Sequence, residues 1–476
     1  MKKNIILGYD NMGYVMENKN YINRIVYKKY NDKIKKIYSL YSKNNLKNQG
    51  IVKTTFRYKN RILIHPKYTI SYPFEWSANM FKDALLFHLN LYLKLDKHEL
   101  TLKDGILNNI LFYKAQPIFV DFFSMIFKRD LSSEIWLLKL NKKNFFDLRF
   151  AIFNSMILPF MIEPFILFAR KNNITARNFL FSHYVNVVQV NSFTYKINKI
   201  FWKKFYKIKY FFFYLNNNLK LLNKSIKIDN KKKFNNFLKK IVNIIKIIDV
   251  SPKVSNYSSY YEDKKENYNF LFDPKWGDKQ KNVFKIIKTY RPKSVLDLGC
   301  NTGWFSFLAA KNGASVIAID NDESCVDKIY LYTKKNNFNI LPLVMSFEDL
   351  HKHKYGIPVK KNTKSKILFS SPISRFQSDM VMCLALSHHL ILGNGLSIKK
   401  IFEDLSLLTK KYLVFEFVDL NDPLIKKHGN FFQNLEKYNK SNYNLDIINQ
   451  IALKSFKNFK IFNSNTLSRK ILLYTK

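Results

Sequence analysis

At 476 residues, the chain is long enough for two or three domains of ordinary size, each able to bury its own core. Its 80 Lys and Arg against 35 Asp and Glu give a formal net charge of +45, which would indicate nucleic acid or an anionic membrane if the cations were clustered. The lysines are spread through the sequence, so we favour a solvated lysine surface. The 3 cysteines, Cys300, Cys325 and Cys383, have neither metal-ligand spacing nor a pairing pattern, which argues against a disulfide scaffold or a metal site and favours a reducing, cytoplasmic setting.

Residues 1–215 are expected to form an N-terminal α+β, helix-rich domain that recognises substrate. Residues 80–95 have helical apolar spacing. In the ordered loop before them, Trp76 is interpreted as a core aromatic residue and Glu75 as a cap or salt-bridge partner.

The most apolar segment, residues 151–169, contains Pro159, Glu163 and Pro164. A membrane-spanning helix would place this carboxylate and both helix breakers in hydrocarbon. We therefore predict no transmembrane segment here and interpret the stretch as buried helices joined near Pro159.

Three polar residues of this half follow a spacing found in phosphotransferases. Asp104 is followed five residues later by Asn109, and Asp121 ends an apolar strand. This resembles the catalytic loop and metal-binding Asp of protein kinases and aminoglycoside phosphotransferases. The glycine-rich loop, the strand lysine with its helix glutamate and the His-Arg before Asp104 are missing, so active phosphotransfer is not favoured. A vestigial kinase-like fold and plain turn chemistry of Asp and Asn both account for the residues.

Two further stretches complete the N-terminal half. Residues 202–210 alternate cations with aromatics, which fits nucleic-acid binding, although helix packing with lysines reaching solvent is favoured. Residues 216–250 begin with a polar, low-complexity run and then become helical, so we place a linker and helix there. The second domain is predicted to span residues 251–476.

The most informative stretch is 294–320, SVLDLGCNTGWFSFLAAKNGASVIAID. An apolar strand at 295–298 leads into a turn bracketed by Gly299 and Gly303, then a helix and a second apolar strand that stops at Asp320. The turn is not G-x-G-x-x-G, and an acid, Asp297, precedes its first glycine. An acid at this place suits a cationic ligand better than a pyrophosphate.

These residues resemble motif I of the class I S-adenosylmethionine-dependent methyltransferases, in particular the subset that reads DLGCNTG. The resemblance implies S-adenosylmethionine as cofactor, with the turn against its methionine moiety and Asp320 on its ribose. Family members often have glycine where Asn301 stands and an acid where Ser346 stands, so Glu348 is named for the adenine contact, with Asp349 as the alternative. The cofactor-binding residues implied are Asp297, Gly299, Cys300, Asn301, Thr302, Gly303, Asp320, Asn321 and Glu348.

The rest of the chain alternates strands and helices as a Rossmann-like, seven-stranded α/β methyltransferase fold requires. The remaining strands are expected at residues 341–345, 379–386, 412–419, 459–462 and 469–474. His388 and His389 follow the fourth strand and Glu416 lies in the fifth, at the edge where such sheets bind ligands. A hydroxyl or protonated amine acceptor needs a base with a pKa near neutrality, so these three residues are the catalytic candidates; the alternative is that one histidine packs inward.

The combination of YPFEW, DLGCNTGW, LALSHH and FEFV resembles the nodulation-type (NoeA-like) bacterial methyltransferases, in which a similar half precedes the catalytic domain. In methyltransferases of this class the segment before the first strand often covers cofactor or substrate, which makes Tyr261 a positional candidate. The resemblance implies methyl transfer to a glycan or small-molecule acceptor. An RNA methyltransferase that uses the basic N-terminal half and a non-catalytic cofactor-binding scaffold are the alternatives.

Overall fold

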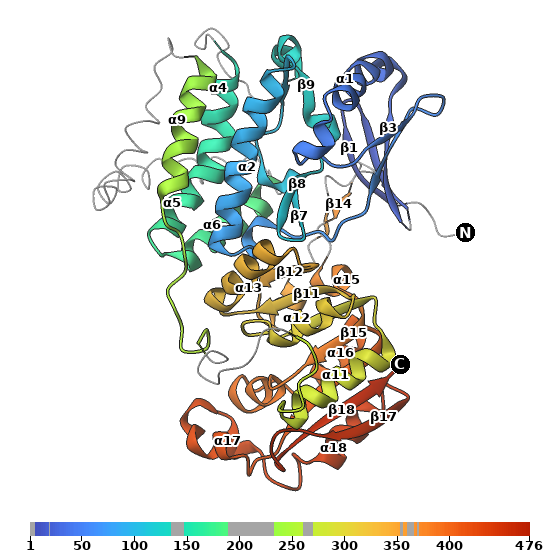
Figure 1. Cartoon of the computed structure of the whole chain (residues 1–476), viewed down its shortest axis with the longest axis vertical. Coiled ribbons are helices and arrows are strands. Elements are labelled where there is room, and N and C mark those ends of the chain that lie inside the picture. Colours follow the sequence, from blue (N-terminus) through green and yellow to red (C-terminus); the bar gives the residue numbers. More distant parts are fainter. Residues whose placement is uncertain are drawn as a thin grey trace. The chain divides into compact units, whose positions relative to one another are not determined.

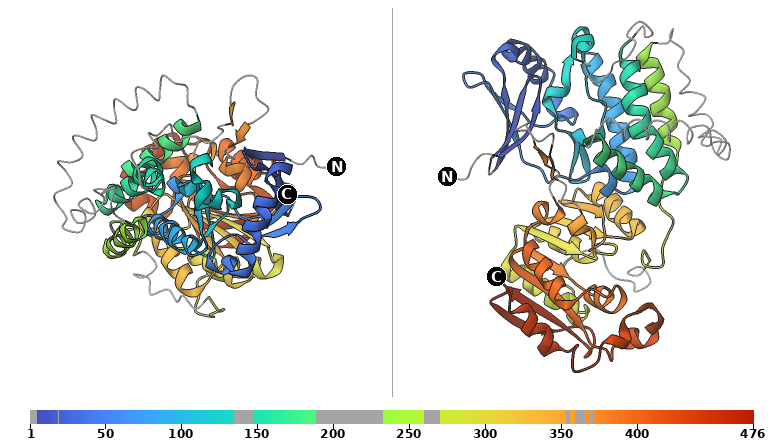
Figure 2. Two further views of the ribbon diagram at one scale, coloured as in Figure 1. Left: turned by 90° about the horizontal axis from the view of Figure 1, so that it is seen from above. Right: turned by 180° about the vertical axis from the view of Figure 1, so that it is seen from behind.

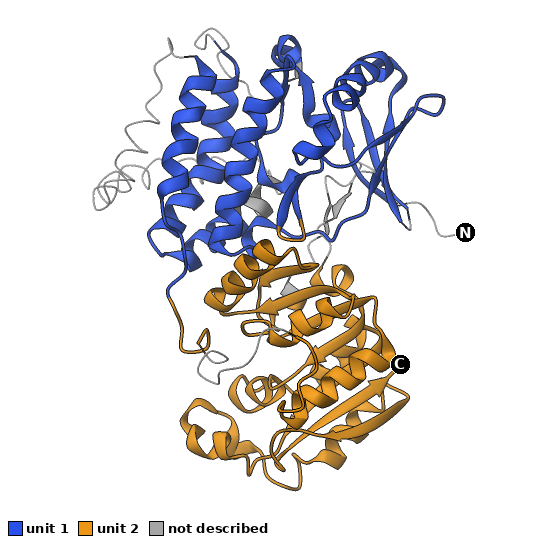
Figure 3. Cartoon of the chain, viewed as in Figure 1, with its two compact units in different colours: residues 1–112, 116–253, 355–369 blue, residues 113–115, 254–354, 370–476 orange. Residues whose placement is uncertain are grey.

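The computed structural model describes residues 5–18, 20–134, 147–188, 233–259, 270–352, 356–358, 366–368 and 371–476. The chain divides into two compact units (Figure 3). Unit 1 comprises residues 1–112, 116–253 and 355–369, and unit 2 comprises residues 113–115, 254–354 and 370–476. The basic aromatic run 202–210 and Tyr261 lie outside the described residues, so their roles stay predictions.

Unit 1 begins with a five-stranded antiparallel sheet in the order β1-β2-β3-β5-β4 (Figure 1). Helix α1 (Asn31–Lys43) connects β3 to β4 and buries Ile34, Ile37 and Tyr41 on one face. The Tyr41 hydroxyl donates a hydrogen bond to the Val52 carbonyl at 3.0 Å, which fastens the helix to the chain entering the sheet. The strands are β1 (Ile5–Asp10), β2 (Gly13–Glu17), β3 (Tyr21–Val26), β4 (Thr55–Arg57) and β5 (Ile62–Pro66).

Helices form most of the rest of unit 1, and several of them run side by side (Figures 1 and 2). Two short two-stranded sheets pair β6 (Leu100–Leu102) with β9 (Met125–Phe127) and β7 (Ile110–Tyr113) with β8 (Gln116–Phe119). Helix α9 packs on α2 and buries Phe234 and Phe237, whose rings lie 5.2 and 4.9 Å from those of Phe150 and Phe153. The helical end of the segment predicted as a linker is thus part of the core of unit 1. The helices are α2 (Ala78–Asp96), α5 (Glu163–Ala169), α6 (Asn173–Val188) and α9 (Phe234–Ile247).

One continuous helical segment stands where two helices joined near Pro159 were predicted. Helix α4 (Arg149–Ile152) continues into a π-helical stretch, η8 (Phe153–Ile162), and then into α5. Pro159 lies inside the π-helical stretch, where the altered hydrogen-bond spacing accommodates a residue without an N–H. Within the described residues, Arg149–Ala169 is the segment long and apolar enough to cross a membrane, but 67% of its most apolar window is buried inside the protein, so length and composition are weak grounds for a span.

Unit 2 is built on a seven-stranded sheet in the order β12-β11-β10-β15-β16-β18-β17. β18 is antiparallel to both of its neighbours, and the strands from β12 to β16 are parallel. The predicted methyltransferase-like α/β fold with a mixed sheet is therefore confirmed for the C-terminal part of the chain. The strands are β10 (Ser294–Leu298), β11 (Ser315–Asp320), β12 (Ile340–Val344), β15 (Ser378–Cys383), β16 (Thr409–Val418), β17 (Asn458–Asn463) and β18 (Arg469–Thr475).

The parallel register brings the carboxyl ends of the central strands to one edge of the sheet. Leu298 pairs with Ile319 of β11 and with Cys383 of β15, which pairs in turn with Phe415 of β16. Central strands of a parallel sheet are covered on both faces, which explains why β10 and β15 read as nearly continuous apolar runs.

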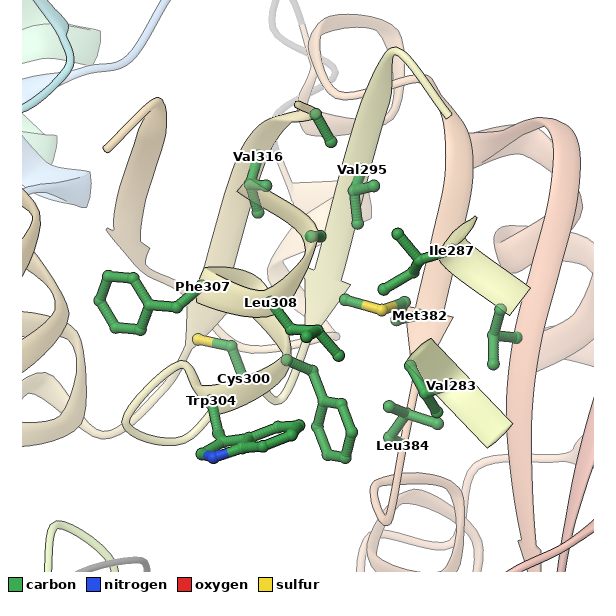
Figure 4. Close-up of a cluster of buried hydrophobic side chains, with 14 of the residues drawn as sticks. Val283, Ile287, Val295, Cys300, Trp304, Phe307, Leu308, Val316, Met382 and Leu384 are labelled. Atoms are coloured by element: carbon green, nitrogen blue, oxygen red, sulfur yellow. The ribbon is translucent and has the colours of Figure 1, made fainter. Parts of the chain in front are cut away.

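A hydrophobic core fills the space between the sheet and two helices, α11 (Asp278–Tyr290) and α12 (Trp304–Lys311). Figure 4 shows Val283 and Ile287 of α11 and Leu308 of α12 converging on strand residues such as Met382. Trp304 has no exposed surface, and its ring lies 5.1 Å from that of Trp276 and 4.9 Å from that of Phe305. The helix that follows the glycine turn is thereby held against the sheet.

We expect Trp304→Ala to lower the free energy of unfolding by roughly 3–5 kcal/mol, because it removes a fully buried aromatic side chain and leaves a cavity. Urea unfolding followed by circular dichroism measures the change. Leu467→Ala is the control, since Leu467 is 94% exposed and its truncation should alter stability by less than about 0.5 kcal/mol. A Trp304→Ala protein as stable as the control would contradict this account of the core.

Candidate functional site

In the turn between β10 and α12, every second residue from Gly299 to Gly303 has a left-handed backbone conformation. The φ angles are +67° at Gly299, +51° at Asn301 and +83° at Gly303. A Cβ atom at Gly303 would lie 2.8 Å from Cγ1 of Ile329, and one at Gly299 would lie 3.1 Å from the Leu386 side chain. Both glycines are therefore required by conformation and by space, whereas asparagine tolerates the third position.

Asp320, at the end of β11, is held by backbone donors on both carboxylate oxygens. Oδ2 accepts the N–H of Asn301 at 2.7 Å, and Oδ1 accepts the N–H of Asp322 at 2.9 Å. Burial raises the pKa of Asp320, while these N–H donors oppose the rise. Each oxygen of a carboxylate can accept a second hydrogen bond, so the group is oriented and can still take hydroxyl donors.

Asp297, in β10, lies at the same edge of the sheet and is almost completely buried. Its Oδ2 accepts the Ser306 hydroxyl at 2.6 Å. Burial raises the pKa of Asp297 to about 7, with the nearby Asp320 carboxylate adding to the rise and Ser306 and Lys279 opposing it. A carboxyl group poised this way changes charge readily when a cation approaches.

The other residues predicted to bind a cofactor surround the turn or follow the neighbouring strands. Cys300 and Thr302 are buried within the turn, and burial raises the pKa of the Cys300 thiol. Asn321 is exposed directly after β11. Glu348 follows β12 and accepts the Asn394 amide at 2.6 Å, whereas the alternative, Asp349, accepts both the N–H and the hydroxyl of Ser346.

The two histidines after β15 have different environments. His388 is buried and its Nδ1 has no hydrogen-bond partner among the described residues, while His389 is exposed. Their rings lie 4.2 Å apart, and the ring of Phe432 lies 5.9 Å from His388 and 5.5 Å from His389. Desolvation by the surrounding protein lowers the pKa of both imidazoles, most strongly for the buried His388, and Arg469 adds to the effect, so both are neutral near pH 7.

Glu416 is the one catalytic candidate whose environment argues against contact with an acceptor. Its side chain has no exposed surface; Oε2 accepts Lys279 Nζ at 2.6 Å and Oε1 accepts the Ser464 hydroxyl at 2.7 Å. Burial alone would raise the pKa of Glu416, but Lys279 and Ser464 outweigh it and the pKa is lowered. Glu416 is a buried anion that joins α11 to the sheet, and this environment disfavours the predicted role as a base.

Several residues near this edge were not identified in the sequence. Lys279 lies at the start of α11, and Asp422 and Arg469 form a bidentate pair at 2.8 and 3.0 Å close to the histidines. No local pattern links Asp422 to Arg469, 47 residues away. Only an expectation that β16 and β18 are adjacent in the sheet could have paired them.

Comparison with known proteins is consistent with this geometry. Residues 276–470 match the FtsJ-like methyltransferase family. The chain is a class I S-adenosylmethionine-dependent methyltransferase. It is 25% identical over 381 residues to the nodulation protein NoeA of Rhizobium meliloti strain 1021, covering 77% of this chain and 72% of that protein.

Solved structures of methyltransferases are similar over part of the chain. The bifunctional kinase-methyltransferase WbdD is 16% identical, with 41% of this chain and 38% of WbdD covered and a TM-score of 0.29. Magnesium protoporphyrin IX methyltransferase of Synechocystis PCC 6803, crystallised with S-adenosylhomocysteine, is 15% identical, with 46% of this chain and 96% of that chain covered and a TM-score of 0.27. The match thus spans less than half the length of WbdD.

The predicted phosphotransferase residues lie together in unit 1 of the methyltransferase. Asp104 follows β6 (Leu100–Leu102) and Asp121 follows β8 (Gln116–Phe119). Burial raises the pKa of Asp104 to about 7, and the nearby Asp121 and Asp10 carboxylates add to the rise while Lys103 opposes it. Asn109 connects to this region through its carbonyl, which accepts the N–H of Val120 at 2.8 Å.

The charged side chains around Asp104 form ion pairs with one another. Asp10 pairs with Lys103 at 2.7 Å, and Asp121 pairs with Arg24 at 2.8 Å. Lys103 also contacts the β1–β2 turn, because its Nζ donates a hydrogen bond to the Asn11 side-chain oxygen at 2.9 Å. Met12, in the same turn, is fully buried. Within the part of the chain that the structure describes, no group of three or more His, Cys, Asp or Glu side chains could hold a metal ion.

The raised pKa of Asp297 predicts how stability depends on pH. Because the pKa is about 7 in the folded state against an ordinary 3.8, the folded protein keeps a proton that the unfolded chain releases between about pH 4 and pH 7. The contribution to stability is full below about pH 4 and is lost as the pH rises through 7. Asparagine is neutral at every pH, so in Asp297→Asn the free energy of unfolding should fall by roughly 2–4 kcal/mol less over this pH range than in the unaltered chain.

Urea unfolding of both proteins at pH 5 and pH 8 measures this difference. The exposed Asp446 supplies the control, Asp446→Asn, whose pH dependence should match that of the unaltered chain. If Asp297→Asn loses as much stability between the two pH values as the unaltered chain, Asp297 is not protonated in the folded state.

Proposed function

We propose that this methyltransferase transfers the methyl group of S-adenosylmethionine to a glycan or small-molecule acceptor whose nucleophile must lose a proton. The observation that carries the proposal is the position of His388 and His389, which follow β15 at the carboxyl edge of the sheet with their rings 4.2 Å apart. Leu386, which packs against Gly299, lies two residues before His388 and three before His389, so turn and imidazoles belong to one neighbourhood.

The residues around the turn fit the proposed cofactor. S-adenosylmethionine supplies an activated sulfonium methyl, and it carries both a cationic centre and vicinal ribose hydroxyls. Asp297 is buried and has no ion pair among the residues that the structure describes, so a cation would favour its charged form, while Asp320 is already oriented to accept hydroxyls. Glu348 is proposed for the adenine end, and the close-packed turn from Gly299 to Gly303 for the methionine end.

His389 is the proposed proton acceptor, because it is the exposed member of the pair. His388 packs against it from the buried side and has no described partner for Nδ1, so it is the candidate for orienting the acceptor or the neighbouring ring. Methyl transfer is an in-line displacement, so the protein contributes mainly alignment and, for a hydroxyl or protonated amine, removal of the proton.

One observation favours an RNA acceptor as the second candidate. A groove of about 460 Å³ lies along α11 and is lined by Lys281, Lys285 and Lys288 together with Phe272 and Phe284. The structure records no acidic partner for these lysines among the described residues, and cations beside aromatic rings suit phosphates and stacked bases. Lysine is abundant throughout this chain, however, so we rank the glycan or small-molecule acceptor first.

Unit 1 is proposed to recognise the acceptor on a vestigial kinase-like scaffold. Its five-stranded antiparallel sheet and the closeness of Asp104 to Asp121 support the scaffold, and the ion pairs to Lys103 and Arg24 argue against phosphotransfer. A cytoplasmic location is also proposed, since all three cysteines are buried free thiols that need no oxidising compartment.

Transfer of labelled methyl groups from S-adenosylmethionine into a cell extract, fractionated into RNA, glycan, lipid, protein and small molecules, tests the function. We expect label in the glycan or small-molecule fraction, with little dependence on salt. Label in RNA that falls steeply as salt rises would favour the second candidate, since counterion release makes phosphate binding salt-dependent. Cofactor binding without label in any fraction would favour a non-catalytic scaffold.

Two variants separate the cofactor role from the acceptor role in the same assay. Asp320→Ala should weaken cofactor binding in calorimetry by about 10- to 100-fold, because charge-assisted hydrogen bonds are lost. His389→Ala should retain cofactor affinity and lower kcat by about 10²-fold or more. Asp446→Ala, at an exposed carboxylate in α18 (Leu445–Ala452), is the control and should match the unaltered chain in both measurements.

The ion pairs in unit 1 give a separate prediction about nucleotides. ATP with Mg²⁺ at millimolar concentration should leave the melting temperature unchanged, because Lys103 and Arg24 are already bound to Asp10 and Asp121. S-adenosylhomocysteine is the positive control and should raise the melting temperature of unit 2. A saturable rise with ATP and Mg²⁺ would show that unit 1 retains a nucleotide site.

A further inference from the structure

The long C-terminal part of unit 2 begins with a short segment, residues 254–259, which we name the strap. It has neither helix nor strand and ends in a turn closed by hydrogen bonds from Ser258 to Ser255. Ser258 is almost completely buried, so the strap is packed at this point and does not run free along the surface.

The strap contacts the start of helix α13 (Glu323–Asn336) through one group of hydrogen bonds. The Ser255 hydroxyl donates to the Asp322 carboxylate, and the Ser324 hydroxyl donates to Ser255 at 3.0 Å. Lys328 Nζ donates to the Ser258 carbonyl at 2.8 Å. Asp322 also caps the helix, accepting the N–H of Ser324 at 2.9 Å.

A second contact joins the strap to the glycine turn. The side-chain amide of Asn301 donates to the Tyr257 carbonyl at 3.0 Å, while its oxygen accepts the N–H of Thr302 at 2.7 Å. Asn301 thus has a left-handed backbone conformation and uses its side chain to reach the strap.

The two residues that hold the strap also hold Asp320. The backbone N–H of Asp322 donates to one Asp320 oxygen and the backbone N–H of Asn301 donates to the other, at 2.9 and 2.7 Å. The side chains of the same two residues bind Ser255 and Tyr257 of the strap. Strap and carboxylate are therefore linked by two short paths, each passing through a single residue.

We infer that the strap is a positioning element for the cofactor: Ser255 and the Asn301 side chain hold the two N–H donors that orient the Asp320 carboxylate. The inference rests on the proposed role of Asp320 in cofactor binding. Because coupling between two sites is reciprocal, a bound cofactor stabilises the strap to the same extent that the strap strengthens cofactor binding. Ser255, Asn301 and Asp322 act through Asp320, so they are positioning residues and not catalytic ones.

Calorimetry with S-adenosylhomocysteine tests the two paths one at a time. Ser255→Ala and Asn301→Gly should each weaken binding by about 3- to 10-fold, the range expected for one or two neutral hydrogen bonds. Ser255→Thr keeps the hydroxyl and should restore affinity. Asn337→Gly is the matched control for Asn301→Gly, because Asn337 also has a left-handed backbone, with φ +55°, but is exposed at the end of α13.

Turnover and hydrogen exchange separate positioning from a loss of folding. Both variants should raise KM for S-adenosylmethionine with kcat nearly unchanged, and in the unaltered chain S-adenosylhomocysteine should slow amide exchange at residues 255–258. Unchanged affinity in both variants, or exchange in the strap that does not respond to the ligand, would overturn the inference while leaving the cofactor site intact. If the unaltered chain binds no S-adenosylhomocysteine, the proposed function itself fails.

Discussion

The Asp320 carboxylate is the group on which the arrangement of the candidate site depends. It ends β11 and accepts backbone N–H groups from Asn301 in the turn and from Asp322 at the cap of α13. A partly buried carboxylate needs hydrogen-bond donors, and here the donors come from the two elements that border the site. The same interaction therefore fixes the turn, the start of the helix and the orientation of the acid.

A second constraint lies on the other side of β10. The Lys279–Glu416 pair joins α11 to β16 with both charges largely buried, and Ser464 satisfies the remaining oxygen of Glu416. Removing one partner of a buried pair leaves an uncompensated charge, so such pairs are strict about geometry even where their net contribution to stability is small. Glu416 therefore connects α11 to β16, and its two partners disfavour contact with an acceptor.

In unit 1, ion pairs determine what the residues with phosphotransferase-like spacing can do. Asp104, Asn109 and Asp121 were recognisable as a spacing, but their chemistry depends on Asp10, Lys103 and Arg24, which come from other parts of the chain. These cations are bound to neighbouring carboxylates, which explains why an arrangement reminiscent of phosphotransfer can persist without supporting it. The position of Trp76 and Glu75 was simpler to predict: Trp76 is fully buried and Glu75 accepts the N–H of Tyr72 at 2.8 Å.

The sequence by itself determined where the strands of the seven-stranded sheet lie along the chain, the glycine turn and the position of Asp320, because hydrophobic periodicity and glycine placement are local signals. It could not decide which polar side chains would be buried or would form ion pairs with distant residues. His388 and His389 are adjacent in sequence, yet one is buried and the other exposed, and Glu416 finds Lys279 from 137 residues away. Burial and long-range pairing arise only when strands and helices assemble, so the tertiary structure alone decided which side chains remain free for chemistry.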